Sequence, residues 1–436
     1  MARPLVYLIN PPSLPGTLAN REGAAGLGVV YSDPAAFCYP PHTLAAAAAT
    51  LRKDDWPVQV FDGIADGSAP DWQGAAAMGV FVSFASLPGD LEYLHQLRAA
   101  TSARVLVFGP SIRFVAPEVF VRAGADAVLI GDAEGYFHEV MRRIVDDSLP
   151  TNVVLSPATL GLPGYDDSGL LEDLDSLPFP AWDRLPWSRY GFLTIMGSRG
   201  CPDHCSYCPY AASQGHRLRA RSVRSVVAEM QHLVEAYRPS RLIFRDPVFA
   251  YQRDRVVGLC EEILRLGLRV NWECESRPEH FDRDVLRLMQ RAGCKWVKIG
   301  LETTDASLLQ SLRRVASHDQ AEQYLAHIAT VVEACRRAAM NCRVFVMTGL
   351  PGQNDDMVLQ TARFVQQMGP DALNIKECES YPGIELSHLG DAADARLQTQ
   401  VLQEVQQELV QRSQSVDRLT RVRRWLRQML RGDRCA

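Results

Sequence analysis

The amino-acid sequence predicts an α/β protein with two successive domains: a doubly wound, Rossmann-like sheet, then a partial (β/α)6 barrel with a helical tail. Apolar strand-like runs alternate with helical stretches twice along the chain, which is typical of parallel sheets covered by helices. Between the two alternations lies a connector whose many prolines block helix. The chain of 436 residues is also too long for one ordinary core. We expect the domains at residues 1–148 and 191–385, the connector at 149–190 and the tail at 386–436.

The first domain is predicted to alternate five strands with four helices. The expected strands are Pro4–Ile9, Val58–Phe61, Met78–Phe84, Arg104–Phe108 and Ala127–Ile130, and the expected helices are Thr43–Arg52, Leu87–Ala100, Pro117–Ala123 and Glu134–Val145. In a doubly wound sheet the carboxyl ends of the strands line the ligand crevice. The candidate ligand-binding residues at these ends are Asn10, Pro11, Ser83, Gly109, Pro110, Gly131 and Glu134. Taken singly, each glycine or proline is equally explained by turn chemistry.

The second alternation predicts about six βα units. The expected strands are Leu193–Met196, Arg241–Arg245, Arg269–Glu273, Trp296–Leu301, Val344–Thr348 and Ala372–Lys376, with helices between them at Ser222–Tyr237, Arg253–Leu266, Asp282–Ala292 and Asp355–Met368. Six such units indicate a partial barrel whose chemistry lies at the carboxyl ends of its strands.

Three cysteines follow the first strand of this barrel directly. Cys201, Cys205 and Cys208 have the spacing C-x3-C-x2-C. Short spacings of this kind gather soft thiolate ligands, which favour an iron–sulfur cluster or zinc. A four-iron cluster would keep one iron without a protein ligand, whereas a structural zinc needs a fourth ligand, which His204 could supply. The spacing alone leaves both readings open.

The cysteine spacing resembles the cluster loop of the radical S-adenosylmethionine (SAM) enzymes, in which an aromatic residue precedes the third cysteine, as Tyr207 does here. The resemblance implies that Cys201, Cys205 and Cys208 bind a [4Fe-4S] cluster. It also implies that the open iron chelates the amino and carboxylate groups of SAM, with Tyr207 near the adenine.

Later strand ends resemble the same family. They include Asp246 in Ile243-Phe-Arg-Asp246-Pro, Glu302 in Gly300-Leu-Glu302 and Gly349 in Gly349-Leu-Pro-Gly352-Gln, and the resemblance implies that all three contact SAM. The chain departs from the family pattern at Pro247, in place of a second aspartate, and at Gln353, in place of a glutamate. A simpler explanation of Glu302 is a cap for the helix that begins near Asp305.

The first domain resembles the cobalamin-binding domain that precedes the radical SAM core in one large enzyme group. Its first strand ends in Asn10-Pro11-Pro12, and Phe108-Gly109-Pro110 resembles the Gly-Gly-Pro turn after the fourth strand. The turn from Gly131 to Glu134 resembles a Gly-Glu-x-Glu turn. No Asp-x-His-x-x-Gly motif is present, so no histidine is evident as a lower cobalt ligand. The resemblance implies cobalamin as a second cofactor.

These resemblances imply a cobalamin-dependent radical SAM enzyme. The leading expectation is a methyltransferase that acts on an unactivated carbon of a small molecule or of a natural-product or lipid precursor. The alternatives are a non-methylating oxidative cyclase or rearrangement enzyme of the same fold, and a regulatory module whose cluster only senses or stabilises. Either enzyme needs an electron donor such as flavodoxin or ferredoxin.

Composition narrows the class of protein further. The formal net charge of −5 argues against a general nucleic-acid binder, and no apolar run reaches the length of a membrane span. The eleven cysteines are mostly scattered singly, which indicates reduced thiols and a cytoplasmic protein. Among them, Cys274 and Cys378 are candidates to face the barrel interior. A basic amphipathic helix is expected at 396–434; we favour packing on the protein itself over peripheral membrane contact.

Overall fold

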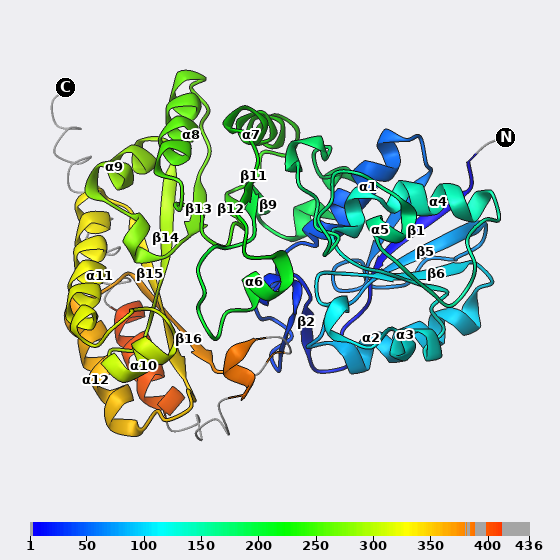
Figure 1. Cartoon of the computed structure of the whole chain (residues 1–436). Coiled ribbons are helices and arrows are strands. Elements are labelled where there is room, and N and C mark those ends of the chain that lie inside the picture. Colours follow the sequence, from blue (N-terminus) through cyan, green and yellow to red (C-terminus); the bar gives the residue numbers. More distant parts are fainter. Residues whose placement is uncertain (1–2, 380, 382–383, 389–397, 412–436) are drawn as a thin grey trace, which may run out of the picture.

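Two six-stranded parallel sheets form the frame of the molecule (Figure 1). The computed structural model describes residues 3–379, 381, 384–388 and 398–411. The last of these ranges is helical, but most of the predicted basic helix at 396–434 lies outside the described residues. In the described part of the chain, no helix combines the length and apolarity needed to span a bilayer.

The first sheet has the order β4-β1-β5-β6-β7-β8 with all strands parallel. The strands are β1 (Leu5–Asn10), β4 (Val58–Asp62), β5 (Ala75–Phe81), β6 (Arg104–Phe108), β7 (Ala127–Leu129) and β8 (Val153–Leu155). The first five have the order of a flavodoxin-like doubly wound sheet, 2-1-3-4-5. The sequence analysis placed β8 in the connector, because a strand of three residues leaves little pattern. β5 begins and ends three residues before its predicted range.

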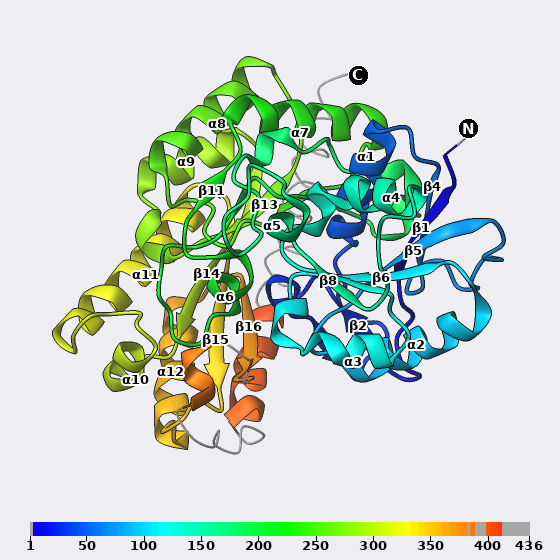
Figure 2. The same ribbon diagram turned by 45° about the vertical axis from the view of Figure 1, so that its right-hand side comes forward.

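Helices cover both faces of this sheet (Figures 1 and 2). They are α1 (His42–Lys53), α2 (Leu87–Ala100), α3 (Pro117–Arg122), α4 (Phe137–Val145) and α5 (Pro157–Leu160). Side chains of β1 alternate between the two layers. Val6 and Leu8 belong to the buried cluster that includes α1 and α4, whereas Tyr7 and Ile9 belong to the cluster with α2 and α3. This double burial explains why the strands are continuous apolar runs.

The second sheet adds its strands in chain order, β16-β15-β14-β13-β12-β9. The strands are β9 (Leu193–Ile195), β12 (Leu242–Phe244), β13 (Trp272–Glu275), β14 (Cys294–Glu302), β15 (Asn341–Thr348) and β16 (Ala372–Glu377). All neighbouring strands are parallel, and β9 and β16 are the two edges, so the sheet is an open, partial barrel. β13 begins three residues after its predicted start.

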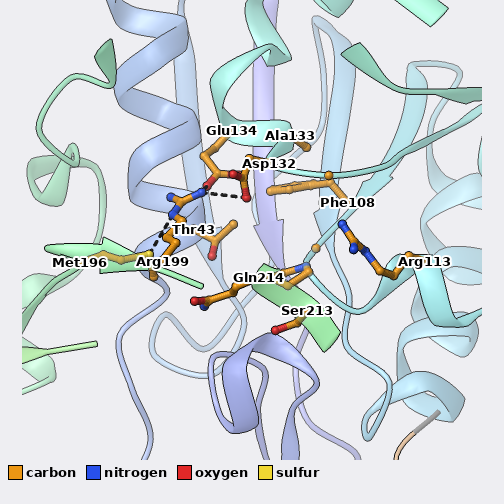
Figure 3. A pocket seen from close by; sticks show the side chains of 13 residues that line it. Thr43, Phe108, Arg113, Asp132, Ala133, Glu134, Met196, Arg199, Ser213 and Gln214 are labelled. Carbon is orange, nitrogen blue, oxygen red and sulfur yellow. Dashed lines mark hydrogen bonds and ion pairs between the residues drawn. The ribbon is translucent and has the colours of Figure 1, made fainter. Parts of the chain in front are cut away.

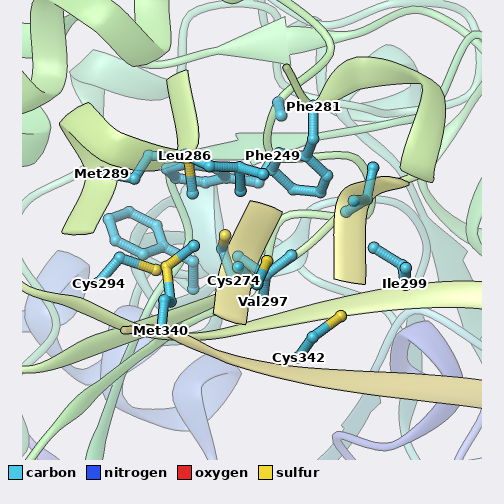
Figure 4. Close-up of a cluster of buried hydrophobic side chains, with 14 of the residues drawn as sticks. Phe249, Cys274, Phe281, Leu286, Met289, Cys294, Val297, Ile299, Met340 and Cys342 are labelled. Carbon is cyan, nitrogen blue, oxygen red and sulfur yellow. The ribbon is translucent and has the colours of Figure 1, made fainter. Parts of the chain in front are cut away.

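The outer face of the partial barrel is covered by helices. They are α7 (Val223–Tyr237), α8 (Arg253–Arg265), α9 (Arg283–Arg291), α10 (Ala306–Ser311), α11 (Asp319–Arg337) and α12 (Asp355–Met368). Their apolar side chains and alternate strand residues form the largest buried cluster. Cys274 lies in it with Cys294 and Cys342 (Figure 4), so its thiol is a core group on the helix side and the expectation that it faces the interior is wrong.

Short elements complete the two domains and the segments between them. They are the strand pairs β2 (Leu18–Asn20) with β3 (Val29–Tyr31) and β10 (Ser198–Arg199) with β11 (Arg219–Ala220), the helix α6 (Pro209–Gln214), and the 3-10 turns at Ala24–Gly26, Ile112–Phe114, Ala133–Gly135, Leu174–Ser176, Trp182–Arg184, Trp187–Arg189, Pro278–His280 and Glu385–His388. The segment between β1 and α1 crosses to the second domain, where Leu27 packs against Tyr381 and Ile384. The carboxyl ends of the two sheets therefore face a shared interface.

Candidate functional site

The three predicted cluster ligands lie in one loop at the carboxyl end of β9. The antiparallel pair of β10 and β11 closes the loop at its base, and Cys201 N donates to Gly215 O at 3.0 Å. Gly200 has φ +79°, and a Cβ there would lie 2.2 Å from Arg217 O. The tight return of the loop therefore requires glycine at this position.

Two guanidinium groups approach one of the thiols. Arg277 Nη1 lies 3.6 Å and Arg314 Nη1 3.8 Å from Cys205 Sγ. Arg314 is 6% exposed and is held by Gly300 O, which accepts from its Nη2 at 2.8 Å. Two cations beside the sulfur favour an anionic group in this loop. Neither arginine was predicted as a site residue, and the only sequence signal for them is that Arg277 follows β13.

A zinc site would need His204 as a fourth ligand beside the three cysteines. His204 instead stacks on His216, with ring centroids 4.6 Å apart. Burial raises the pKa of Cys201 to about 12 and that of Cys208 well above its usual value. Both thiols must lose their protons to bind metal.

Tyr207 and Glu302 come together as a buried pair beside the loop. The Tyr207 hydroxyl donates to Glu302 Oε1 at 2.7 Å, and Glu302 has an unusual positive φ of 66°. Burial raises the pKa of Glu302, although nearby Arg314 and the Tyr207 hydrogen bond oppose the rise. The capping explanation of Glu302 is wrong, because Asp305 itself accepts from Leu308 N at 2.9 Å and caps α10.

Asp246 and Gly349 both form hydrogen bonds with other residues of the chain. Asp246 is 1% exposed and accepts from Gly197 N at 2.8 Å and from Ser198 Oγ at 2.6 Å. This carboxylate therefore fastens the start of the cysteine loop to β12. Gly349 N donates to Gln398 Oε1 at 3.0 Å, so a helix after the last barrel strand covers that turn.

Four of the seven predicted ligand residues of the first domain line one cavity (Figure 3). Gly109, Pro110, Gly131 and Glu134 surround it at the ends of β6 and β7. Its remaining walls are Thr43, Phe108, Arg113, Asp132, Ala133, Met196, Arg199, Ser213 and Gln214. Because Met196, Arg199, Ser213 and Gln214 belong to the second domain, the cavity lies between the first sheet and the cysteine loop.

Buried ion pairs cross the wall of this cavity. Arg199 Nη1 lies 2.9 Å from Asp132 Oδ1 and 2.6 Å from Glu134 Oε1, and Arg219 Nη1 lies 2.7 Å from Asp132 Oδ2. Burial raises the pKa of Glu134, whereas the two arginines outweigh burial at Asp132 and lower its pKa. We call these four residues the domain-bridging charge cluster. It connects the strand that begins the cysteine loop to the first domain.

The other three predicted residues form hydrogen bonds within the chain. Arg21 Nη1 donates to Asn10 Oδ1 at 2.9 Å and to Pro11 O at 2.7 Å, and Arg21 Nη2 pairs with the fully buried Asp90 at 2.5 Å. Ser83 Oγ shares a hydrogen bond of 2.6 Å with Ser86. Arg21 therefore bonds the end of β1 to α2 beside the crevice between β1 and β5, which usually takes the ligand in this fold.

Comparisons with known proteins assign the second domain. Residues 195–365 match the model of the Radical SAM superfamily. An uncharacterized methyltransferase of Pyrococcus horikoshii is 26% identical over 298 residues, which are 65% of this chain and 62% of the relative. The anaerobic magnesium-protoporphyrin IX monomethyl ester cyclase of Rubrivivax gelatinosus is 26% identical over 238 residues, 51% of this chain and 40% of that protein. The chain thus spans less than two thirds of the length of either relative.

A solved structure shares the fold of both domains. It is the radical SAM methyltransferase TsrM of Kitasatospora setae with cobalamin and a [4Fe-4S] cluster bound. The TM-score is 0.66 at 17% identity, and the match covers 88% of this chain and 77% of TsrM. The expected fold, a Rossmann-like domain followed by a partial radical SAM barrel, is confirmed.

Proposed function

We propose that the protein is a cobalamin-dependent radical SAM methyltransferase that acts on an unactivated carbon of a small molecule, because residues 195–365 match the model of the Radical SAM superfamily. One observation carries the proposal. The C-x3-C-x2-C loop lies at the carboxyl end of the first barrel strand, next to the Tyr207–Glu302 pair, and it faces a cavity of the preceding domain. These are the places that a cluster, SAM and a second cofactor would need.

The residues present fit a [4Fe-4S] cluster with SAM. Cys201, Cys205 and Cys208 would hold the cluster, and the cations of Arg277 and Arg314 would offset its negative charge. Glu302 and Tyr207 would bind SAM. When bound, the cluster and SAM would supply the radical chemistry needed to abstract hydrogen from an unreactive carbon.

The residues around the interdomain cavity fit part of a corrinoid. Gly109, Pro110, Gly131 and Glu134 line the cavity, and the buried Ser111 Oγ beside them has no hydrogen-bond partner in the described structure. Asn10, Pro11 and Ser83 are satisfied by other groups and contribute to the shape of the domain rather than to its open surface. When bound, cobalamin supplies the methyl group.

The chain's own residues position and enclose this chemistry. Asp246 holds Gly197 and Ser198, which sets the origin of the cysteine loop. Glu302, kept in place by the Tyr207 hydroxyl, presents a carboxylate that can accept hydrogen bonds from ribose hydroxyls or an ammonium group. Leu27, Tyr381 and Ile384 pack across the domain interface and exclude water, which protects reactive intermediates.

A non-methylating cyclase is the second candidate, because the matched cyclase of Rubrivivax gelatinosus shares the region that holds the cysteine loop. The two functions differ in their products. A methyltransferase adds one methylene unit to its substrate and forms S-adenosylhomocysteine, whereas a cyclase does neither. We further propose a flavodoxin- or ferredoxin-like electron donor. All ten described cysteines are free thiols, which supports a reducing, cytoplasmic setting.

The test is anaerobic reconstitution with iron, sulfide and cobalamin, followed by absorbance spectra and analysis of products formed from SAM and dithionite. We expect cluster and corrinoid bands, 5′-deoxyadenosine and S-adenosylhomocysteine. Cys205→Ala should abolish 5′-deoxyadenosine, whereas Cys260→Ala, which removes a buried thiol of α8, should retain it. Retained SAM cleavage in Cys205→Ala would refute the radical SAM proposal. Absence of both corrinoid binding and S-adenosylhomocysteine would refute the methyltransferase assignment.

A further inference from the structure

Charged side chains gather on the inner face of the partial barrel. Glu275, Lys298 and Arg343 lie side by side in register on β13, β14 and β15. Burial raises the pKa of Glu275, and the charges of Lys298, Lys376, Arg245 and Arg343 oppose this rise. Lys298 Nζ pairs with Glu273 Oε2 at 3.0 Å. No ion pair within 4.0 Å joins any of the other three cations to a carboxylate in the described part of the chain. Arg245, Arg343 and Lys376 therefore have no close ion-pair partner among the described residues, and their charges are opposed from farther away, by Glu275 and, for Arg245, also by Glu22.

Two of these cations have hydrogen-bonding capacity that the described chain does not use. Arg245 is 7% exposed; its Nη2 donates to Glu22 O, but its Nη1 is buried with no partner. Arg343 Nε is likewise buried and unpartnered. A buried N–H without an acceptor costs free energy, which an anionic oxygen from a ligand would recover.

Aromatic rings lie beside all three cations. The Arg245 guanidinium carbon lies 3.7 Å from the ring centroid of Tyr39, a residue of the first domain. Arg343 Cζ lies 5.0 Å from the Trp296 ring. Lys376 Nζ, on an exposed side chain, lies 6.0 Å from that of Phe345. Such a mixture suits an amphipathic organic anion better than a neutral polycyclic lipid, which would leave the cations desolvated and unpaired.

The charged face also lies in the right place for a substrate. Lys298, the register partner of Glu275, lies on the same strand as Glu302, β14. Arg245 Nη2 donates to Glu22 O, and its guanidinium group lies over the Tyr39 ring, so this cation contacts the first domain. The face thus lies between the residues proposed for SAM and the domain proposed for cobalamin.

We propose that the substrate carries a carboxylate or phosphate group that binds Arg245, Arg343 and Lys376, and a hydrogen-bond donor that binds Glu275. This inference rests on the proposed function, because it assigns the substrate class of that enzyme. It narrows the substrate from any small molecule or lipid precursor to an organic anion of moderate size.

The test is equilibrium dialysis of the reconstituted full-length protein with three probes of similar size: phenylacetate, phenyl phosphate and neutral phenylacetamide. We expect at least one anion to bind about tenfold more tightly than the amide, the factor for one charge-assisted hydrogen bond. Tighter binding of phenylacetate would indicate a carboxylate on the substrate, and tighter binding of phenyl phosphate would indicate a phosphate. Equal retention of all three probes, or of none, overturns the inference.

Matched lysine variants assign the binding to this face. Lys376→Met should weaken the bound anion about tenfold, and Lys376→Arg should restore it. Lys295→Met, which removes an exposed lysine of β14 that is not among the cations acting on the pKa of Glu275, should leave binding unchanged. An equal loss in the Lys295 and Lys376 variants would place the anion elsewhere.

Saturating SAM separates this site from the SAM site. If the anion and SAM bind together, the cations serve a second molecule. If SAM displaces the anion, the cations belong to the SAM site and the inference fails while the proposed function stands. Formation of 5′-deoxyadenosine by the same preparation, without any probe, reports the proposed function independently.

Discussion

Replacing Arg199 with methionine tests the energetic role of the domain-bridging charge cluster. The Arg199, Asp132 and Glu134 side chains are 7%, 12% and 7% exposed. Methionine keeps an unbranched chain but removes the charge. Asp132 retains Arg219 at 2.7 Å, whereas Glu134 loses the one cation that pairs with it in the described structure. Removing one partner of a buried ion pair typically lowers the free energy of unfolding by about 3–5 kcal/mol. We expect a decrease of this size at pH 7.5.

Native-state hydrogen exchange is a suitable assay, because a chain with two domains need not unfold in one step. The free energy of opening measured by exchange should fall by about 3–5 kcal/mol in peptides that contain β7 and in peptides that contain β10. Arg265→Met removes the exposed partner of Glu262 and should leave protection unchanged. In the double variant of Arg199→Met with Glu134→Gln, part of the loss should be recovered, since no unpaired carboxylate remains.

The loss should also depend on pH. Burial raises the pKa of Glu134 above 4.5, and the variant lacks the Arg199 charge that opposes this rise. A carboxyl whose folded-state pKa is raised subtracts stability once pH exceeds its unfolded pKa, so the variant should be least stable at high pH. Its deficit should shrink as pH falls from 7.5 toward 4.5. An equal deficit at pH 5 and pH 7.5, or a double variant no better than the single one, would refute this account.

Three further changes follow from the site geometry. Cys205→Ala should abolish the electron paramagnetic resonance signal of the reduced cluster, and an unchanged signal would exclude this ligand. Tyr207→Phe removes one hydrogen bond of 2.7 Å to the buried Glu302. The Kd for SAM, measured by calorimetry, should therefore rise about fivefold, which corresponds to roughly 1 kcal/mol. An unchanged Kd would show that the Tyr207–Glu302 pair does not support SAM binding. Gly131→Ala places a Cβ 2.1 Å from Gly169 O at φ +92°, so thermal unfolding of the first domain should begin at a clearly lower temperature, and an unchanged Tm would contradict this clash.

The elements that could be predicted from sequence are those with long local patterns. The buried strands of both sheets are continuous apolar runs, and the cysteine spacing is local, so both can be recognised in the sequence. β8 has only three residues and was missed. Arg277 and Arg314 meet Cys205 across 72 and 109 residues of chain, and no local pattern signals such pairings.

Long-range side-chain pairing also decides which of the predicted site residues are already hydrogen-bonded within the chain. Asp246 lies at a strand end, as a SAM ligand would, but its carboxylate is used by Gly197 and Ser198. Asn10 and Ser83 likewise stand at the crevice position of a doubly wound sheet. Whether such residues face a ligand depends on Arg21, which reaches them from a separate strand pair and bonds to Asn10 and Asp90.

The cavity at β6 and β7 has a thermodynamic consequence for the whole molecule. Its walls come from both domains, so a ligand there contributes to the contact between them. Binding and domain docking are then linked equilibria: a ligand at 100 times its Kd stabilises the docked form by about 2.7 kcal/mol. Bound cofactor should therefore slow proteolysis of the connector. Docking of the two domains should in turn slow dissociation of the cofactor.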